Sequence, residues 1–133
     1  MSTRTVADKL LIKPGTTVWS SHPSRLHLVG PLPEGVHPVD ALGETSTALL
    51  FADDAAALRA LLAEHEDELA GPQAFWVVYP KGNRSDVNRD SLWPMLAGHG
   101  MRPIAQIAVD EVWSALRFRP LEAGEPAFAG GAG

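Results

Sequence analysis

The sequence predicts an α/β fold in which a mostly parallel sheet lies between helices and ends in an antiparallel hairpin. Three observations lead to this prediction. Short apolar segments alternate with segments of helical periodicity along most of the chain. Two apolar segments, 47–51 and 74–79, contain no charged residue, which is typical of parallel strands buried on both faces. The last two apolar segments, 104–109 and 112–118, are separated only by Asp110 and Glu111, which is hairpin spacing.

Length and composition indicate one folding unit. With 133 residues and 45% hydrophobic composition, the chain can bury one core and is too short for two ordinary domains. A single domain over 1–120 is therefore expected. Gly, Ala, Pro and Glu dominate the remainder, so 121–133 is expected to be a disordered tail.

The first forty residues carry clear breaks between their elements. Pro14 and Gly15 end the first helix, and Pro38 cannot donate a hydrogen bond to a sheet, which places its strand at an edge. The elements expected are a helix over 6–12, a strand over 16–20, a weak helix over 23–29 and a strand over 36–39.

The central part of the chain gives the strongest signals. Asp53 and Asp54 follow the buried strand over 47–51 and are typical N-cap residues for a helix over 55–69, which has leucines at helical spacing. Gly71 and Pro72 end that helix. The strand over 74–79 is the most apolar and is therefore expected to be central.

A polar loop over 81–90 leads into the last elements. A helix is expected over 91–97, where Pro94 is harmless if it lies in the first turn. The hairpin turn lacks the glycine that a tight turn of two residues prefers. In this order the elements describe a small three-layer sandwich of Rossmann-like layout.

Several segments resemble known families. Gly71 and Pro72, a strand ending at Pro80, a helix and an antiparallel pair occur in the order in which a class I methyltransferase ends. The chain is also similar to a bacterial family of domains of unknown function, best known from actinobacteria. Four strings carry that similarity: KPG at 13–15, WVVYPK at 76–81, NRDSLW at 88–93 and DEVWSALRFRP at 110–120. The resemblance implies a truncated methyltransferase-like frame and no established activity.

The resemblance also predicts what has been lost. A class I methyltransferase needs glycine after its first strand, because the cofactor lies directly on that backbone. Here residues 20–25 contain no glycine. Asp40 stands where an acidic residue would accept hydrogen bonds from ribose hydroxyls, although such a residue is also a common turn residue. The interval between Asp40 and Thr47 is too short for a further helix and strand, which implies that this pair is deleted.

Ligands of open parallel sheets bind outside the carboxyl ends of the strands, and polar residues gather there. Ser21, His22 and Asp53 are the residue types of a nucleophile, a base and an orienting acid, but the Gly-x-Ser-x-Gly turn is absent. A catalytic set is therefore not predicted. The candidate ligand-binding residues are Ser21, His22, Asp40, Lys81, Asn83, Arg84, Asn88 and Arg89.

The cationic loop over 81–90 has two interpretations. Lys81, Arg84 and Arg89 could bind a small anion or an acidic partner, since Asn83 and its glycine neighbour permit tight turns. Alternatively the arginines pair with nearby acidic side chains and hold the loop against the hairpin. Structural roles are expected for Asp53, Asp54, Asp110, Glu111 and Trp113.

Composition excludes several classes. The net charge of −5 gives no attraction to nucleic acid or anionic lipid, and the chain has no cysteine. The five histidines show no metal-ligand spacing, and no signal peptide or membrane span is expected, so the default location is cytoplasmic. No cofactor is predicted. We expect a non-catalytic binding or regulatory module; the alternatives are a divergent S-adenosylmethionine- or nucleotide-dependent enzyme and a structural subunit of an oligomer.

Overall fold

The computed structural model of the chain describes residues 6–82, 85–122 and 124. In this part of the chain a single six-stranded sheet is formed. The helices are α1 (Val6–Lys9), α2 (Ala55–Glu64) and α3 (Arg89–Ala97), and the 3-10 turns are η1 (Pro23–Val29), η2 (Leu42–Glu44) and η3 (Glu66–Glu68). The strands are β1 (Thr17–Ser20), β2 (His37–Pro38), β3 (Thr47–Phe51), β4 (Ala74–Pro80), β5 (Met101–Ala108) and β6 (Trp113–Pro120).

The sheet confirms the predicted fold class. Its strand order is β2-β1-β3-β4-β6-β5, with parallel pairing from β2 to β4 and antiparallel pairing of β6 with both β4 and β5. The two strands without charged residues, β3 and β4, are the middle pair, and every residue in them except Pro80 is buried. As Pro38 predicts, β2 lies at the edge.

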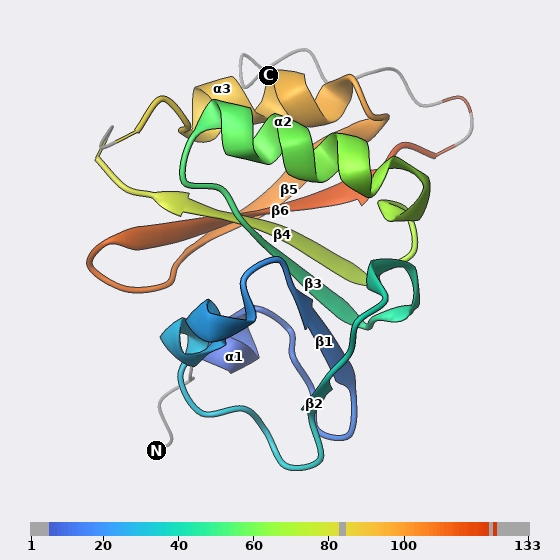
Figure 1. Ribbon diagram of the computed structural model, residues 1–133, viewed down its shortest axis with the longest axis vertical. Helices are drawn as coiled ribbons and strands as arrows, with labels where there is room; N and C mark the ends of the chain where they lie inside the picture. Colours follow the sequence, from blue (N-terminus) through green and yellow to red (C-terminus); the bar gives the residue numbers. More distant parts are fainter. Residues whose placement is uncertain (1–5, 83–84, 123, 125–133) are drawn as a thin grey trace.

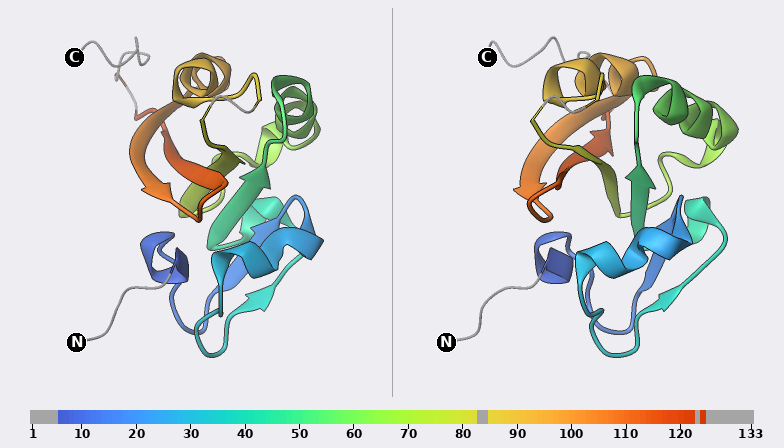
Figure 2. Two further views of the ribbon diagram at one scale, coloured as in Figure 1. Left: turned by 90° about the vertical axis from the view of Figure 1, so that its left-hand side faces the viewer. Right: turned by 60° about the vertical axis from the view of Figure 1, so that its left-hand side comes forward.

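Helical segments cover both faces of the sheet (Figures 1 and 2). Helices α2 and α3 pack on one face, where a core cluster includes Leu58, Leu92 and Leu116. On the other face, α1 and η1 cover a second cluster built around Phe51 and Trp76. The result is the three-layer arrangement expected from the sequence.

Helix α1 ends in a Schellman motif with leucine in the place that glycine usually takes. The backbone N–H of Ile12 donates to the carbonyl of Ala7, and that of Leu11 donates to Asp8. Leu11 has a φ of 66°, in the left-handed region that costs an L-residue about 1–2 kcal/mol. The motif turns the chain so that Leu10 and Ile12 are both buried.

Three helix boundaries differ from the predictions, and the first of them is the end of α1, which lies at Lys9 rather than at residue 12. Helix α2 ends at Glu64, because the chain turns at His65 into η3, and this turn is what brings Leu69 into the core. Helix α3 begins at Arg89 rather than at residue 91, because Asn88 and Ser91 form a reciprocal capping box. Pro94 is therefore the sixth helical residue and lies beyond the first turn, where the expected tolerance does not apply.

The hairpin also differs from the prediction. Strand β5 begins at Met101, three residues earlier than expected, with a register shift between Pro103 and Ala105. The connection is not a tight turn of two residues. Asp110 Oδ1 accepts hydrogen bonds from the backbone N–H groups of Val112 and Trp113, both at 2.7 Å, and so organises a wider turn without glycine.

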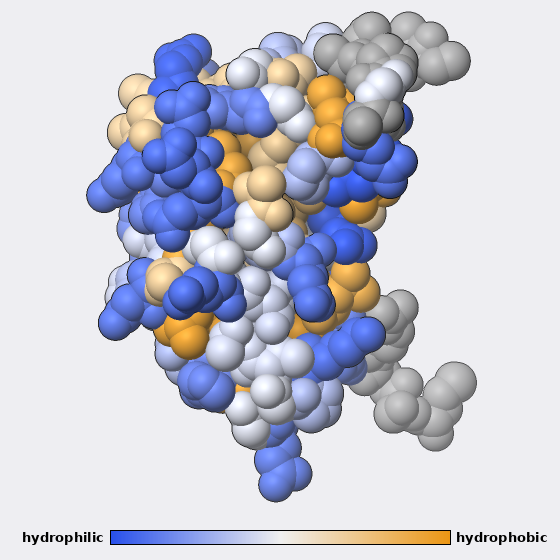
Figure 3. Space-filling model, turned by 90° about the vertical axis from the view of Figure 1, so that its right-hand side faces the viewer, coloured by the Kyte–Doolittle hydropathy of each residue, from blue (hydrophilic) through white to orange (hydrophobic). Residues whose placement is uncertain are grey.

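The surface carries no broad apolar area on the side seen in Figure 3, where apolar atoms form separate patches among polar ones. Within the part of the chain that the structure describes, no helix is long and apolar enough to cross a membrane. The predicted disordered tail over 121–133 falls almost entirely outside the described residues.

Candidate functional site

The carboxyl ends of β1, β3 and β4 meet at one edge of the sheet, and the candidate residues follow these ends. Strand β2 lies on one side of β1, and the next strand, β3, lies on the other side. The order of the parallel strands therefore reverses at β1, and the topological switch point is between β1 and β3. Open α/β sheets bind their ligands in the crevice at such a point. The segments that meet here begin at Ser21 after β1 and at Asp53 after β3.

Ser21 joins the ends of β1 and β3. Its backbone N–H donates to the carbonyl of Leu49 at 3.0 Å, and its Oγ accepts from the N–H of Phe51 at 2.8 Å. The Ser21 side chain thus takes the place of a backbone acceptor for β3 just beyond the end of β1. The same Oγ lies 2.8 Å from Nδ1 of His22. The structure therefore brings Ser21 and His22 together, with the hydroxyl already used by the backbone of β3.

Arg25 links the segments that follow β1 and β3. Its guanidinium forms a two-pronged ion pair with Asp53, with N–O distances of 2.7 and 3.0 Å. The same group lies 5.5 Å from the ring centre of Trp113 and 6.0 Å from that of Phe51, within the range of cation–π attraction. The ion pair therefore ties η1 to β3 across the switch point.

The ion pair sets the charge state of Asp53. The hydrogen bond from Arg25 lowers the pKa of this carboxyl, and the charges of Arg25 and His22 act in the same direction against partial burial. This role corrects the expectation that Asp53 caps α2. Asp54 alone does so, with Oδ1 accepting from the N–H of Ala57 at 2.7 Å.

A serine and an aspartate fasten the next loop to this edge. Ser85 Oγ donates to the carbonyl of Asp53 at 2.5 Å, and Asp86 Oδ1 accepts from the N–H of Ala55 at 2.7 Å. The start of α2 is therefore held from the loop after β4. Asp86 serves the backbone here; its pairing with an arginine stays a prediction, because Arg84 and the side chain of Arg89 lie outside the described residues.

An open pocket lies between the ends of β1 and β2, on the other side of β1 from β3. Its volume is about 390 Å³. Ser21 and Asp40 line it, as do apolar side chains of the β1 and β2 ends and of η1: Trp19, Pro23, Leu26, Pro38 and Val39. Asp40 is exposed, whereas Trp19 is buried and packs edge-on against His65 with 4.9 Å between ring centres. We call this cavity the β1–β2 pocket.

The loop after β4 lines a second cavity of about 330 Å³, which includes Lys81 and Asn88. Asn88 is also the cap of α3, with Oδ1 accepting from the N–H of Ser91 at 3.0 Å. Arg89 begins α3, and its side chain lies outside the described part of the structure, as do Asn83 and Arg84. The proposed grouping of three cations therefore stays a prediction.

The same cavity contains polar groups that no pattern in the sequence selects. Gln106 Nε2 donates to the hydroxyl of buried Tyr79 at 2.8 Å and lies 3.4 Å from Ser114 Oγ. These residues are on β4, β5 and β6, so only the register of the antiparallel strands brings them together. Asp110 and Trp113 have the turn and packing contacts described above, and Glu111 is exposed.

Arg25 is the principal site residue that sequence reasoning missed. It lies in a segment that was assigned to a weak helix, and its partner Asp53 is distant in the chain. The available signal was an arginine after β1 and an acidic pair after β3, since neighbouring parallel strands end at the same edge. Among the described residues, no group of three His, Asp or Glu side chains is placed to hold a metal ion.

Comparisons with known proteins agree on the fold. No family model and no curated protein matches the sequence. A solved protein of the NADB-Rossmann superfamily from Streptococcus agalactiae is similar, with a TM-score of 0.54 at 11% identity over 90% of this chain and 69% of that one. Sp1610 of Streptococcus pneumoniae, described as "a putative tRNA (m1A22) methyltransferase", is similar with a TM-score of 0.56 at 11% identity over 96% and 70%.

The same Streptococcus pneumoniae protein in complex with S-adenosyl-L-methionine matches with a TM-score of 0.53 at 12% identity, over 96% of this chain and 73% of that one. The chain therefore has a Rossmann-like, methyltransferase-type fold. The resemblance to a family of domains of unknown function stays a prediction, because no family model matches.

Proposed function

We propose that this domain binds the nucleoside part of a cofactor of the S-adenosylmethionine kind in the β1–β2 pocket, as a divergent relative of the class I methyltransferases. The observation that carries the proposal is the pocket itself. It is open, it lies at the carboxyl ends of two neighbouring parallel strands, and it has Asp40 in its wall. Its volume falls in the range of small-molecule sites, roughly 300–1,000 Å³.

The residues of the pocket fit a nucleoside. An exposed carboxylate after the second strand can accept hydrogen bonds from two ribose hydroxyls, which is the role of the acidic residue in dinucleotide-binding folds. Apolar groups of Trp19, Leu26 and Val39 offer a surface for a base. Residues 20–25 contain no glycine, so the backbone cradle for the remainder of such a cofactor is missing. The proposal is accordingly limited to the nucleoside part.

The structural neighbours support a ligand of this chemical kind. The Streptococcus pneumoniae protein with the same fold was solved with S-adenosyl-L-methionine. The description of that protein as a putative tRNA methyltransferase also gives no support to our expectation that nucleic acid is excluded. We retain the charge argument against nucleic acid as a prediction only.

A second candidate is a module that binds a ligand without transforming it. Two contacts at the switch point favour it. Asp53 forms an ion pair with Arg25, and the Ser21 hydroxyl accepts a hydrogen bond from the backbone N–H of Phe51. These contacts engage Ser21 and Asp53, two of the three residues that could otherwise act as a nucleophile, base and acid. Both candidates use the β1–β2 pocket and differ in whether turnover follows binding.

Isothermal titration of the full chain with S-adenosylmethionine, S-adenosylhomocysteine and adenosine tests the proposal. We expect saturable binding of all three, weakened tenfold or more by Asp40→Asn, because a hydrogen bond to a charged group contributes about 1.5–3 kcal/mol. The matched control is Glu44→Gln, an equal change of charge at an exposed residue of η2 outside the pocket. Absence of binding at millimolar ligand, or equal weakening by both variants, contradicts the proposal.

A second measurement separates the two candidates. Release of S-adenosylhomocysteine during incubation with mixed methyl acceptors, small molecules and RNA included, indicates an enzyme. Binding without release under the same conditions indicates the regulatory module.

A further inference from the structure

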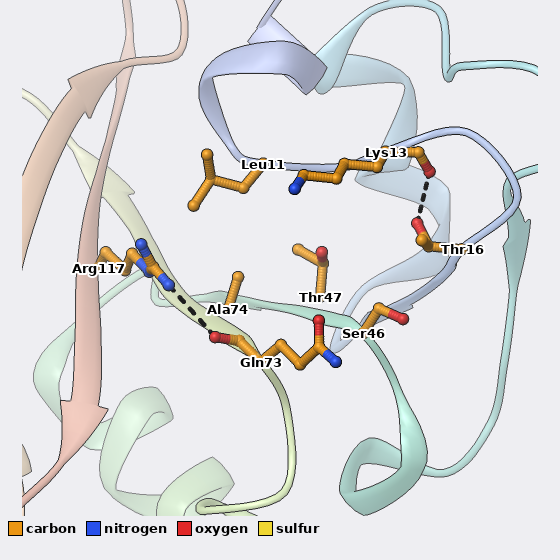
Figure 4. A pocket seen from close by; sticks show the side chains of 8 residues that line it. All are labelled: Leu11, Lys13, Thr16, Ser46, Thr47, Gln73, Ala74 and Arg117. Atoms are coloured by element: carbon orange, nitrogen blue, oxygen red, sulfur yellow. Dashed lines mark hydrogen bonds between the residues drawn. The ribbon is translucent and has the colours of Figure 1, made fainter.

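A separate pocket lies at the opposite edge of the sheet, where β1, β3 and β4 begin. Its volume is about 180 Å³. One wall is the segment between α1 and β1, with Leu11, Lys13 and Thr16, and the other is Arg117 of β6. The strand starts between them supply Ser46 and Gln73. We call this cavity the amino-edge pocket (Figure 4).

Two cations from distant parts of the chain face this pocket. In Figure 4 the side chains of Lys13 and Arg117 extend from opposite walls into the space between them. Arg117 donates one hydrogen bond, from a terminal guanidinium nitrogen to the carbonyl of Gln73 at 3.3 Å. Its Nε is buried and has no hydrogen-bond partner among the described residues. Part of the hydrogen-bonding capacity of the guanidinium group is therefore not used by the described residues.

The surroundings supply no opposite charge. None of the residues that line the pocket is acidic, and neither Lys13 nor Arg117 forms an ion pair with a described carboxylate. This is notable in a protein with a net charge of −5, where acidic residues outnumber basic ones. Two cations that face the same partly enclosed space repel each other, and an anion between them offsets this repulsion.

The polar groups in the walls suit an anion as well. The side-chain amide of Gln73 lines the pocket and can donate hydrogen bonds. Thr16 Oγ1 donates to the carbonyl of Lys13 at 2.6 Å and so fixes the backbone that carries the lysine. Arginine provides a planar fork for an oxyanion, and lysine provides a compact point charge.

We propose that the amino-edge pocket binds a compact oxyanion, the phosphate or carboxylate group of a small molecule, between Lys13 and Arg117. The volume suits one such group and not a whole nucleotide. The proposal is independent of the β1–β2 pocket, since the two cavities share no residue and lie at opposite edges of the sheet.

Titration with inorganic phosphate, with acetate as a second arm and chloride at matched ionic strength as the blank, tests this proposal by amide NMR of the full chain. We expect saturable shifts centred on Thr16, Ser46 and Gln73. Lys13→Gln should weaken binding at least tenfold. The matched control is Lys9→Gln, which removes the same charge from an exposed residue of α1 outside the pocket and should change affinity less than twofold.

Stronger binding of phosphate than acetate assigns a phosphoryl ligand, and the reverse assigns a carboxylate. Arg117→Lys keeps the charge and removes the fork, so a loss of affinity in a variant with unchanged amide spectra elsewhere supports a direct contact. The proposal is overturned if neither anion gives saturable shifts beyond chloride, or if Lys9→Gln weakens binding as much as Lys13→Gln.

Discussion

The ion pair between Arg25 and Asp53 offers the sharpest test of how the carboxyl edge is held together. The side chains are 29% and 47% exposed, so solvent screens their attraction. Exposed ion pairs contribute about 0.2–1 kcal/mol, and the two-pronged geometry places this pair near the upper end. The cation–π contact with Trp113 adds about 0.5–1 kcal/mol. Arg25→Met should therefore lower the free energy of unfolding by about 1–2 kcal/mol.

A double-mutant cycle isolates the ion pair from the ring contacts. Asp53→Asn removes the charge and leaves Arg25 over the rings, so the coupling between Arg25→Met and Asp53→Asn should be about 0.5–1 kcal/mol at pH 7. Urea denaturation of the four proteins measures it. Arg59→Met, on the exposed face of α2, is the control for loss of an arginine without this contact.

The coupling should also depend on pH with a definite sign. The pKa of Asp53 is lowered in the folded protein, chiefly by the hydrogen bond from Arg25. Its stabilising effect is complete above the pKa of an unfolded aspartate, about 3.9, and is lost as the pH falls through the lower folded value. Coupling that is absent at pH 7, or that persists unchanged when the carboxyl is protonated, would refute this account.

Three further substitutions are expected to lower the free energy of unfolding, each measured by urea denaturation. Ser21→Ala leaves the N–H of Phe51 without its acceptor and should cost about 1–3 kcal/mol. In Gly71→Ala, the added Cβ would lie 2.3 Å from the carbonyl oxygen of Gly43, so the cost should be about 1–3 kcal/mol or more, and an unchanged midpoint would contradict the geometry. Asp110→Ala removes the acceptor of two turn amides at an exposed site and should cost about 0.5–1.5 kcal/mol.

The sheet could be predicted because the residue types of its strands indicate which strands are buried. Both middle strands are apolar runs without charge, and Pro38 identifies an edge because a proline lacks the donor that a second neighbour would need. The two C-terminal strands were predicted as a hairpin from their spacing alone. In each case a local property of the sequence decides the outcome.

Boundaries that depend on tertiary contacts were predicted less well. The leucine pattern of α2 continues past His65, yet the helix stops there, and Glu68 Oε2 instead accepts a hydrogen bond from the N–H of Gly43 at 3.0 Å. That partner lies far away in the chain, so no local pattern reports it. The start of α3 was predicted two residues too late for a different reason. Its capping pair, Asn88 and Ser91, is local and is visible in the sequence.

Some residues of the candidate site could also be predicted from local patterns, and others depend on tertiary contacts. Ser21 and Asp40 were predicted from their places after strands, and both line the β1–β2 pocket. Arg25 and Arg117 were not selected: the contact of Arg25 depends on the path of η1, and that of Arg117 depends on the face of β6 that the arginine occupies. Charged side chains in strands and short helices are usually solvated, and only the packed neighbours show which ones face a cavity.

The β1–β2 pocket and the amino-edge pocket differ in charge, which makes their ligands independent. At the carboxyl edge the cation Arg25 is paired with Asp53, and the carboxylate of Asp40 remains in the pocket wall. At the amino edge Lys13 and Arg117 remain without a described carboxylate. An anion is therefore repelled by Asp40 at the first pocket and attracted at the second, whereas an uncharged nucleoside is not repelled by Asp40 and can donate hydrogen bonds to it. Adenosine and inorganic phosphate should consequently bind to the same molecule without competing for one site.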